Sequence, residues 1–142
     1  MALVTDIAEA VKEELDASSF SLPFSAKRFY QPLFELEEMQ DLHVSVVPQA
    51  LTIFSLSRSQ GQYDVKIDVA VQKKFQRGEA AELDPLMDLV EEIAGHFRAK
   101  RLAGLPGAMW VKTENAPIFA QEHMEEMRQF TSVLTFTFRV QR

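Results

Sequence analysis

The sequence predicts an α+β domain in which an antiparallel or mixed β-sheet carries two main helices packed on one face. Segments of alternating apolar and polar residues outnumber segments with helical periodicity. The strand segments also follow one another directly instead of alternating with helices, and each helical segment has a single apolar stripe. The predicted order is one helix, four strands, a second helix and two strands. A chain of 142 residues without a linker or repeat fits one such domain.

Residues 4–16 form the first predicted helix. Its apolar residues recur at three- and four-residue spacings, opposite an acidic face. They are Val4, Ile7, Ala8, Val11 and Leu15. We expect Thr5 to be the N-cap and Asp6 to lie in the first turn, where a negative charge is favourable.

Short strands are predicted between this helix and the middle of the chain. The Pro-containing segment that follows the helix predicts an edge strand around residues 26–30. Residues 35–41 are predicted to form a short acidic turn or helix. A strand at 42–47 follows, and Pro48 closes it.

The strongest pattern is a long hairpin over residues 51–71. Two β-like runs flank a turn that contains Gly61, and the second run alternates regularly. This alternation indicates one buried face, which must rest on a helix or join further strands. Asp64 and Asp68 flank Lys66 on one strand face, so we expect them to pair with it and stay ionised.

The second helix is predicted to start with Asp84 as N-cap and Pro85 at the first helical position. Its apolar stripe is Leu86, Leu89, Val90, Ile93 and Phe97. Gly95 indicates either close backbone packing or a weak last turn. The segment 102–107 contains Gly104 and follows basic residues, which favours helix termination over anion binding.

The remainder predicts a strand at 108–113, one or two helical turns within 118–128, and a final strand at 133–140. The final strand alternates Leu134, Phe136, Phe138 and Val140 with polar or β-branched residues.

No catalytic or metal-binding pattern is found. The chain has no cysteine, which fits a reducing compartment, and His43, His96 and His123 do not have the spacing of paired helical ligands. No nucleophile elbow or phosphate-binding glycine motif occurs. We therefore expect no enzyme activity, no cofactor and no metal. A net charge of −6 argues against a nucleic-acid partner, and no apolar run is long enough to span a membrane.

Two features indicate a protein partner. The final strand has a flat polar face with Thr135, Thr137 and Arg139. Several Phe residues also lie outside the regular stripes, and either they join one core or they cover an interface between copies. These residues are Phe20, Phe24, Phe29, Phe34, Phe75 and Phe119.

The chain resembles the tail terminator and tail-completion (neck) proteins of tailed bacteriophages and prophages over nearly its whole length. The likeness lies in the order of elements and in short phrases. These are the early strand with Arg28, Tyr30 and Pro32, then DLHVSVVP, the hairpin SRSQGQYDVKIDVAVQKK, the second helix and the closing FTSVLTFTFRV. The hairpin contains a Tyr-Asp pair, and Phe130-Thr131-Ser132 precedes the last strand.

The resemblance implies a structural protein made in the bacterial cytoplasm and found in the virion tail. Such proteins form a ring, usually of six copies, at the head-proximal end of the tail tube, where they stop tube polymerisation and meet the head connector. The ring requires a lateral contact that closes by rotation.

The residues most exposed to such partners are predicted at two excursions from the sheet and on the last strand. They are Arg58, Gln60, Gly61 and Gln62 at the hairpin tip, Arg77, Glu79 and Glu82 in the loop 77–82, and Thr135, Thr137 and Arg139. The alternative interpretation is that the two excursions are only solvated loops. If the tip makes the contact, Arg58→Glu weakens assembly and leaves folding intact.

Two other functions stay open from the sequence. An oligomeric chaperone or adaptor would be a dimer with an apolar groove, whereas a small ligand-binding domain would need a pocket with convergent polar groups. The mass in solution separates the ring from the dimer.

Overall fold

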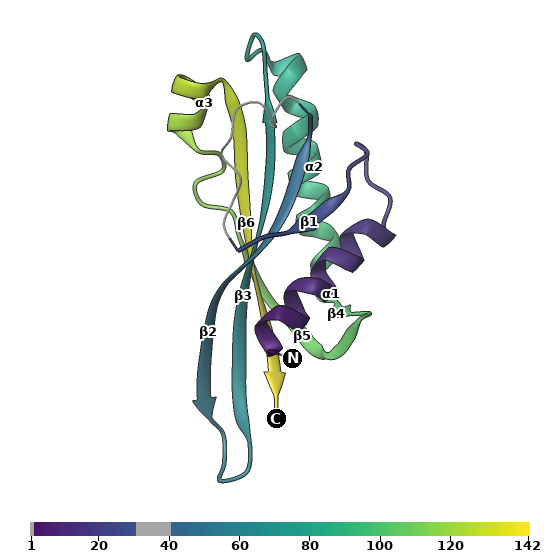
Figure 1. The fold of residues 1–142 in the computed structure, drawn as a ribbon, viewed down its shortest axis with the longest axis vertical. Helices are drawn as coiled ribbons and strands as arrows, with labels where there is room; N and C mark the ends of the chain where they lie inside the picture. The colour runs from purple at the N-terminus through teal and green to yellow at the C-terminus, as the bar shows by residue number, and fades with distance from the viewer. Residues whose placement is uncertain (1, 31–40) are drawn as a thin grey trace.

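The structure is a computed structural model that describes residues 2–30 and 41–142 (Figure 1). Its elements, in chain order, are α1 (Leu3–Ala17), β1 (Ala26–Arg28), β2 (His43–Ser55), β3 (Gly61–Lys74), α2 (Ala80–Phe97), β4 (Arg101–Leu102), β5 (Leu105–Glu114), α3 (Gln121–Met127) and β6 (Gln129–Gln141).

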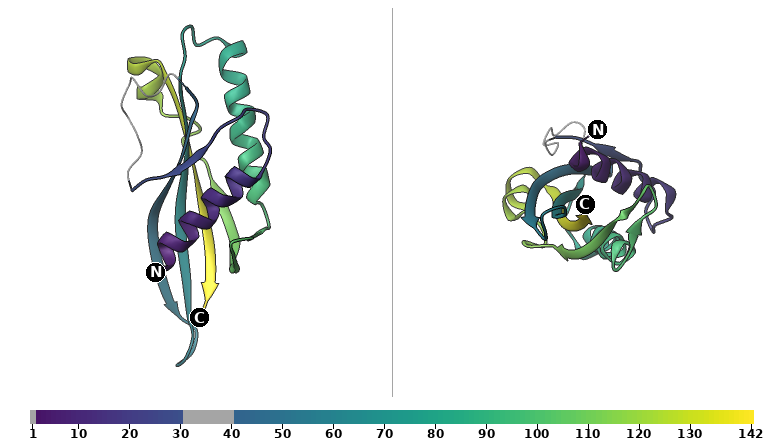
Figure 2. Two further views of the ribbon diagram at one scale, coloured as in Figure 1. Left: turned by 45° about the vertical axis from the view of Figure 1, so that its right-hand side comes forward. Right: turned by 90° about the horizontal axis from the view of Figure 1, so that it is seen from below.

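The six strands form one mixed sheet in the order β1-β2-β3-β6-β5-β4. Only β1 and β2 pair in parallel, and every other neighbouring pair is antiparallel. The sheet twists and curls, and α1 and α2 lie on the same face of it (Figures 1 and 2). This arrangement confirms the predicted α+β fold with two main helices on one face.

The core lies between that face and the two helices. Alternating residues of β3 and β6, Val65 to Val71 and Leu134 to Phe138, meet the stripes predicted for both helices, and these side chains are almost fully buried. The ring of Phe97 on α2 lies 4.8 Å from that of Phe136 and 6.3 Å from that of Phe138, centroid to centroid. Burial of this apolar area is the main source of stability.

The predicted break at Pro48 is wrong. β2 is a single strand of 13 residues that continues through Pro48. A bulge between Pro48 and Ala50 leaves Gln49 without a residue opposite it in the backbone pairing with β3. A bulge is one of the few places in a sheet that accept a residue without an N–H donor, so the strand continues past the proline. Three strands therefore precede α2 instead of four, and β4 is an additional short strand that sequence reasoning missed.

The acidic turn or helix predicted at 35–41 lies outside the described residues, except for Asp41. The early edge strand is confirmed but shorter than predicted, since it spans only Ala26–Arg28.

Both helices start earlier than predicted. α1 has Ala2 as its N-cap, with no side-chain hydrogen bond, and Thr5 lies inside the helix, while Asp6 does fall in the first turn. α2 starts after Glu79, so the expected cap Asp84 and the proline that follows it lie within the helix. A helix can start before these residues because the preceding loop is held by another carboxylate.

That carboxylate is Glu82 in the first turn of α2. It accepts hydrogen bonds from the backbone N–H groups of Gln76, Arg77 and Gly78 at 2.9 to 3.0 Å. Three such bonds hold the pKa of Glu82 below its ordinary value. They fold the loop back onto the helix start.

The end of α2 also differs from prediction. The helix ends at Phe97, and Ala99 just beyond it has a φ of 58°. Gly104 lies in the turn between β4 and β5, so it does not terminate the helix. A Cβ at Gly95 would have no atom within 4 Å, which excludes the close packing considered there.

Candidate assembly surface

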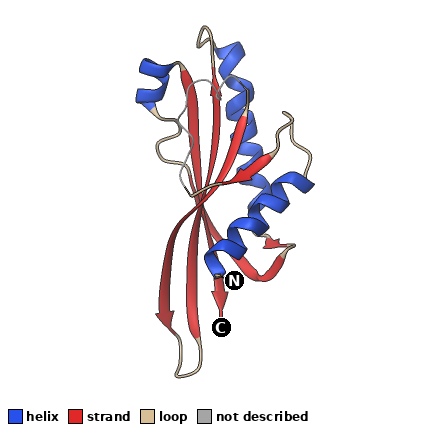
Figure 3. Cartoon of the chain, viewed as in Figure 1, coloured by secondary structure: helices blue, strands red, loops and turns tan. Residues whose placement is uncertain are grey.

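The most prominent feature of the surface is the end of the β2–β3 hairpin, residues 48–62, which we call the arm. It extends beyond the C-terminus at one end of the molecule (Figures 1 and 3). Its strands pair in register from Ala50 opposite Lys66 to Ser55 opposite Gly61. The turn is closed by the N–H of Leu56, which donates to the carbonyl of Gln60 at 3.0 Å.

The β3 side of the arm is anchored to the last strand almost as far as the turn. Gly61 and Arg142 exchange two backbone hydrogen bonds of 2.8 and 3.0 Å. The guanidinium of Arg139 on β6 donates to both carboxylate oxygens of Asp64 on β3, at 2.9 and 3.1 Å. This bidentate pair holds the pKa of Asp64 below its ordinary value. The arm is therefore a supported extension of the sheet.

Large apolar side chains lie open to solvent along β2 in the arm and at the turn. The exposed fractions are 44% for Leu51, 56% for Ile53, 50% for Phe54 and 47% for Leu56. Four of the seven large apolar side chains that are exposed in the described part of the chain thus lie within six residues. Single exposed apolar residues are normal on a surface, whereas such a cluster marks a binding surface.

These side chains occupy both faces of the arm. Leu51 and Ile53 pair with Val65 and Tyr63, so they lie on the face that carries the helices. Phe54 pairs with Gln62 and lies on the opposite face. The bulge before Ala50 decides which side chains lie on which face of the arm, because one extra residue reverses the direction of every later side chain.

The outer edge of β2 is also open along the arm. β1 pairs with β2 only from Val44 to Val46, and the N–H of Phe29 adds one bond to the carbonyl of Val46 at 2.9 Å. From residue 47 to 55, no strand among the described residues pairs with this edge. An open edge with apolar side chains favours contact with another chain.

The predicted tip residues do lie on this feature. Arg58 is exposed at the turn, and Gln60 closes the turn through its backbone. Gly61 and Gln62 begin β3, where Gln62 pairs with Phe54. Sequence reasoning found the tip but missed the apolar side chains behind it, because it assigned the whole hairpin a buried face. The adjacent Ile53 and Phe54 were the available signal, since neighbours in a strand face opposite sides.

The second predicted excursion, residues 77–82, leads into α2 at the end of the molecule opposite the arm, and it is tied to the start of that helix (Figure 1). Glu82 uses its carboxylate to bind the loop, Glu79 caps the helix start, and the backbone of Arg77 is one of the three donors to Glu82. The loop is thus bound to its own helix while Arg77 and Glu79 remain exposed, so its role as a contact surface stays a prediction.

The last strand cannot pair sideways either. β6 lies inside the sheet between β3 and β5. Thr137 is only 3% exposed, the hydroxyl of Thr135 donates to Asp68 at 2.7 Å, and Arg139 is bound to Asp64. This predicted surface is therefore corrected to an interior strand in which Thr135 and Arg139 bind aspartates of β3 and Thr137 is buried.

The carboxylates of β3 have other partners than expected. Asp64 binds Arg139, and Asp68 accepts hydrogen bonds from Thr135 and from the side-chain amide of Gln49 at 3.2 Å. Burial raises the pKa of Asp68 above its ordinary value, although both hydrogen bonds and the charge of Lys66 oppose this shift.

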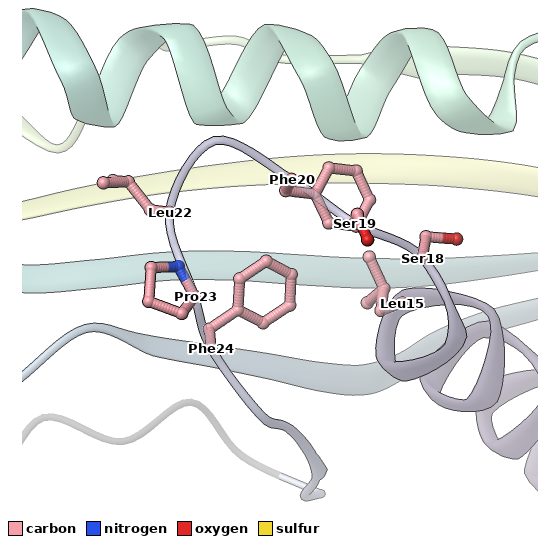
Figure 4. Close-up of a pocket in the computed structure, with 7 residues that line it drawn as sticks. All are labelled: Leu15, Ser18, Ser19, Phe20, Leu22, Pro23 and Phe24. Atoms are coloured by element: carbon pink, nitrogen blue, oxygen red, sulfur yellow. The ribbon is translucent and has the colours of Figure 1, made fainter.

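The phenylalanines outside the regular stripes mainly cover the core. Phe20 and Phe24 stack with ring centroids 5.5 Å apart beside a depression of about 290 Å³ at the end of α1 (Figure 4). Phe75 and Phe119 also pack on the core, Phe29 is partly buried, and Phe34 lies outside the described residues. The core interpretation is thus the better one for the described members, and the exposed apolar surface lies on the arm.

A polar cluster joins α1 to α2. Nε2 of His96 lies 3.0 Å from a carboxylate oxygen of Glu14 and 3.1 Å from the hydroxyl of Ser18. Burial raises the pKa of Glu14, but the bonds from His96 and from the N–H of Ala103 and the nearby positive charges outweigh it and lower the pKa overall.

No protein-family model matches the chain, and no curated protein gives a significant sequence match. Among residues 2–30 and 41–142, no three carboxylate or imidazole groups gather where they would hold a metal ion. Within the same ranges, no helix has the length and apolar character needed to cross a membrane.

Proposed function

We propose that this protein is a structural subunit whose copies assemble into a ring at the head-proximal end of a phage tail tube. The ring ends tube polymerisation and joins the tail to the head. The observation that supports this function best is the anchored arm, which holds apolar side chains on both faces beside an open strand edge.

The arm supplies what a lateral contact needs. Its four exposed apolar side chains are each about half open, so together they offer roughly 300–400 Å² of apolar area if each large side chain brings about 150–200 Å². A standard interface buries about 800 Å² per partner. The apolar group therefore covers about half of that area, and the polar strand edge and turn supply more.

The arm also carries little charge that would make identical copies repel one another. The chain has a net charge of −6, but residues 48–62 contain no carboxylate and only one charged residue, Arg58. Identical acidic subunits therefore meet with little electrostatic opposition through the arm. A contact between two different surfaces of identical copies builds a closed ring when the rotation from one copy to the next adds up to a full turn.

The first test is the mass in solution as a function of protein concentration, with electron microscopy of the assembled fraction. We expect a ring of about six copies, in line with the resemblance of the sequence. A compact dimer would favour the chaperone or adaptor, and a monomer at all concentrations would contradict unaided ring formation.

The second test concerns the tail. The genes that flank this one are expected to encode a tail tube protein and a tape-measure protein. Purified tube protein is then polymerised with and without this protein, and tube lengths are measured. Shorter tubes with one capped end support the function, and unchanged tubes contradict it.

A further inference from the structure

A depression of about 500 Å³ lies on the sheet near the base of the arm. It is lined mainly by β5 and the end of β6. The lining residues are Arg101, Gly107, Met109, Trp110, Val111, Arg139 and Gln141. Met109 is 48% exposed, so the depression presents an open apolar surface beside the guanidinium of Arg139.

The arm and the depression lie level with each other across the sheet. Thr52 pairs with Asp64, Asp64 with Arg139, and Arg139 with Met109. Two residues further along the arm, Phe54 pairs with Gln62, which pairs with Gln141 at the rim of the depression. A copy displaced sideways, without a shift along the strands, therefore meets the depression with its arm.

The two features also share a face of the sheet. Val65 and Phe138 point into the core, so the residues next to them in their strands, Asp64 and Arg139, point away from the helices. Phe54 pairs with Gln62 and Met109 pairs with Arg139, so both side chains also point away from the helices. Phe54 thus lies on the same outer face as the depression, so in a sideways contact its ring reaches the depression of the next copy across that face.

The strand directions agree with a head-to-tail contact. β2, β3, β6 and β5 are successively antiparallel, so β5 runs opposite to β2. A rotation about an axis along the strands preserves these directions, so β2 of one copy approaches the β5 side of the next copy in the antiparallel sense, with the short edge strand β4 beside β5 at the level of Met109.

We propose that the ring of Phe54 of one copy packs across the outer face of the next copy against the depression lined by Met109, Trp110 and Arg139. This inference rests on the proposed assembly and specifies its contact. An aromatic ring packs favourably against a thioether and over a guanidinium, and this depression offers both. The same contact repeated around the ring uses each arm and each depression once.

The proposed contact is made mainly by side chains and not by a continuous series of backbone hydrogen bonds between strands. Pro48 has no N–H to donate at the start of the free edge of β2. On the other side, β4 covers β5 as far as Trp110, whose N–H donates to the carbonyl of Lys100 at 3.1 Å. The recognition must therefore depend on Phe54 and its neighbours.

The absence of cysteine allows a direct test by disulfide cross-linking. The double variant F54C/M109C is oxidised under mild conditions and run on a non-reducing gel. We expect a ladder of covalent multimers, because each copy carries one cysteine on its arm and one in its depression. Each copy can therefore be linked to two neighbours. The matched control is F54C/I118C, since Ile118 is exposed to a similar extent (53%) but lies in the segment before α3, outside the depression.

A ladder in F54C/M109C but not in the control supports the contact. No ladder in F54C/M109C overturns it, as does dimer formation by F54C alone at the same yield, which would show arms meeting arms. The mass of the wild-type protein separates the two proposals: an assembled wild type without the ladder overturns this contact and leaves the proposed ring standing. A wild type that stays monomeric contradicts both.

Discussion

Replacing two apolar side chains of the arm, in the double variant I53T/F54T, separates assembly from folding. The two side chains are 56% and 50% exposed, and threonine keeps the β preference of the strand. If an interface covers the exposed halves, each side chain loses contact area of roughly 90 Å², which at about 25 cal/mol per Å² corresponds to about 2 kcal/mol.

The expected effect on assembly is large. Threonine itself recovers part of the lost area, so the pair is expected to cost about 3 kcal/mol at each contact, which weakens association by more than 100-fold. The effect on the monomer is smaller, because only the inner halves of these side chains pack on the sheet. We expect a loss of about 1–2 kcal/mol in the free energy of unfolding and a cooperative transition.

Sedimentation velocity over a range of concentrations measures association, and urea unfolding followed by circular dichroism measures stability. Ile118→Thr is the control, because that side chain is 53% exposed and lies outside the arm. The control is expected to assemble like the wild type. If I53T/F54T assembles within about threefold of the wild type, the arm is not the contact and the reasoning fails.

Three further predictions concern the tip, the core and the cluster between the helices. Arg58→Glu is expected to weaken assembly and leave the thermal midpoint unchanged, and an unchanged sedimentation profile would exclude the tip from the contact. Phe97→Ala is expected to lower the free energy of unfolding by about 3–5 kcal/mol, as measured with urea, since the ring is fully buried against β6. Glu14→Gln is expected to cost about 1–2 kcal/mol at pH 7 by weakening the bond to His96. Because the folded pKa of Glu14 is lowered, its contribution is complete above the ordinary value of 4.5 and is lost as the pH falls through the folded pKa. Unfolding curves of both proteins from pH 7 to 3 should therefore converge, and a constant difference would contradict this account.

Periodicity predicted the elements that have one buried face. The stripe of α2 from Leu86 to Phe97 and the alternation of β6 are found in the structure as predicted. Both patterns arise because one side of the element meets the core and the other does not. Local rules for element ends were less successful. Asp84 and Pro85 resemble a helix start, but Glu82 binds the preceding loop and the helix begins a turn earlier.

The candidate surface could be predicted only in part. The tip around Arg58 follows from the turn signal, whereas the exposure of Leu51 and Ile53 depends on where the helices end above the sheet. The same apolar residues would be core residues in a strand covered by α1 or α2. The bulge at Gln49 also breaks the alternation within β2. The face on which each later side chain of β2 lies therefore follows only from the pairing with β3.

The sequence by itself determined the fold class, the two helices and the buried faces of the central strands, because local periodicity records which side of each element avoids water. Only the tertiary structure decided which apolar residues stay uncovered, since exposure depends on elements that are distant in the chain. It placed β6 inside the sheet, which buries Thr137, and it left the edge of β2 open along the arm. The exposed arm, and the depression level with it, are therefore properties of the assembled sheet.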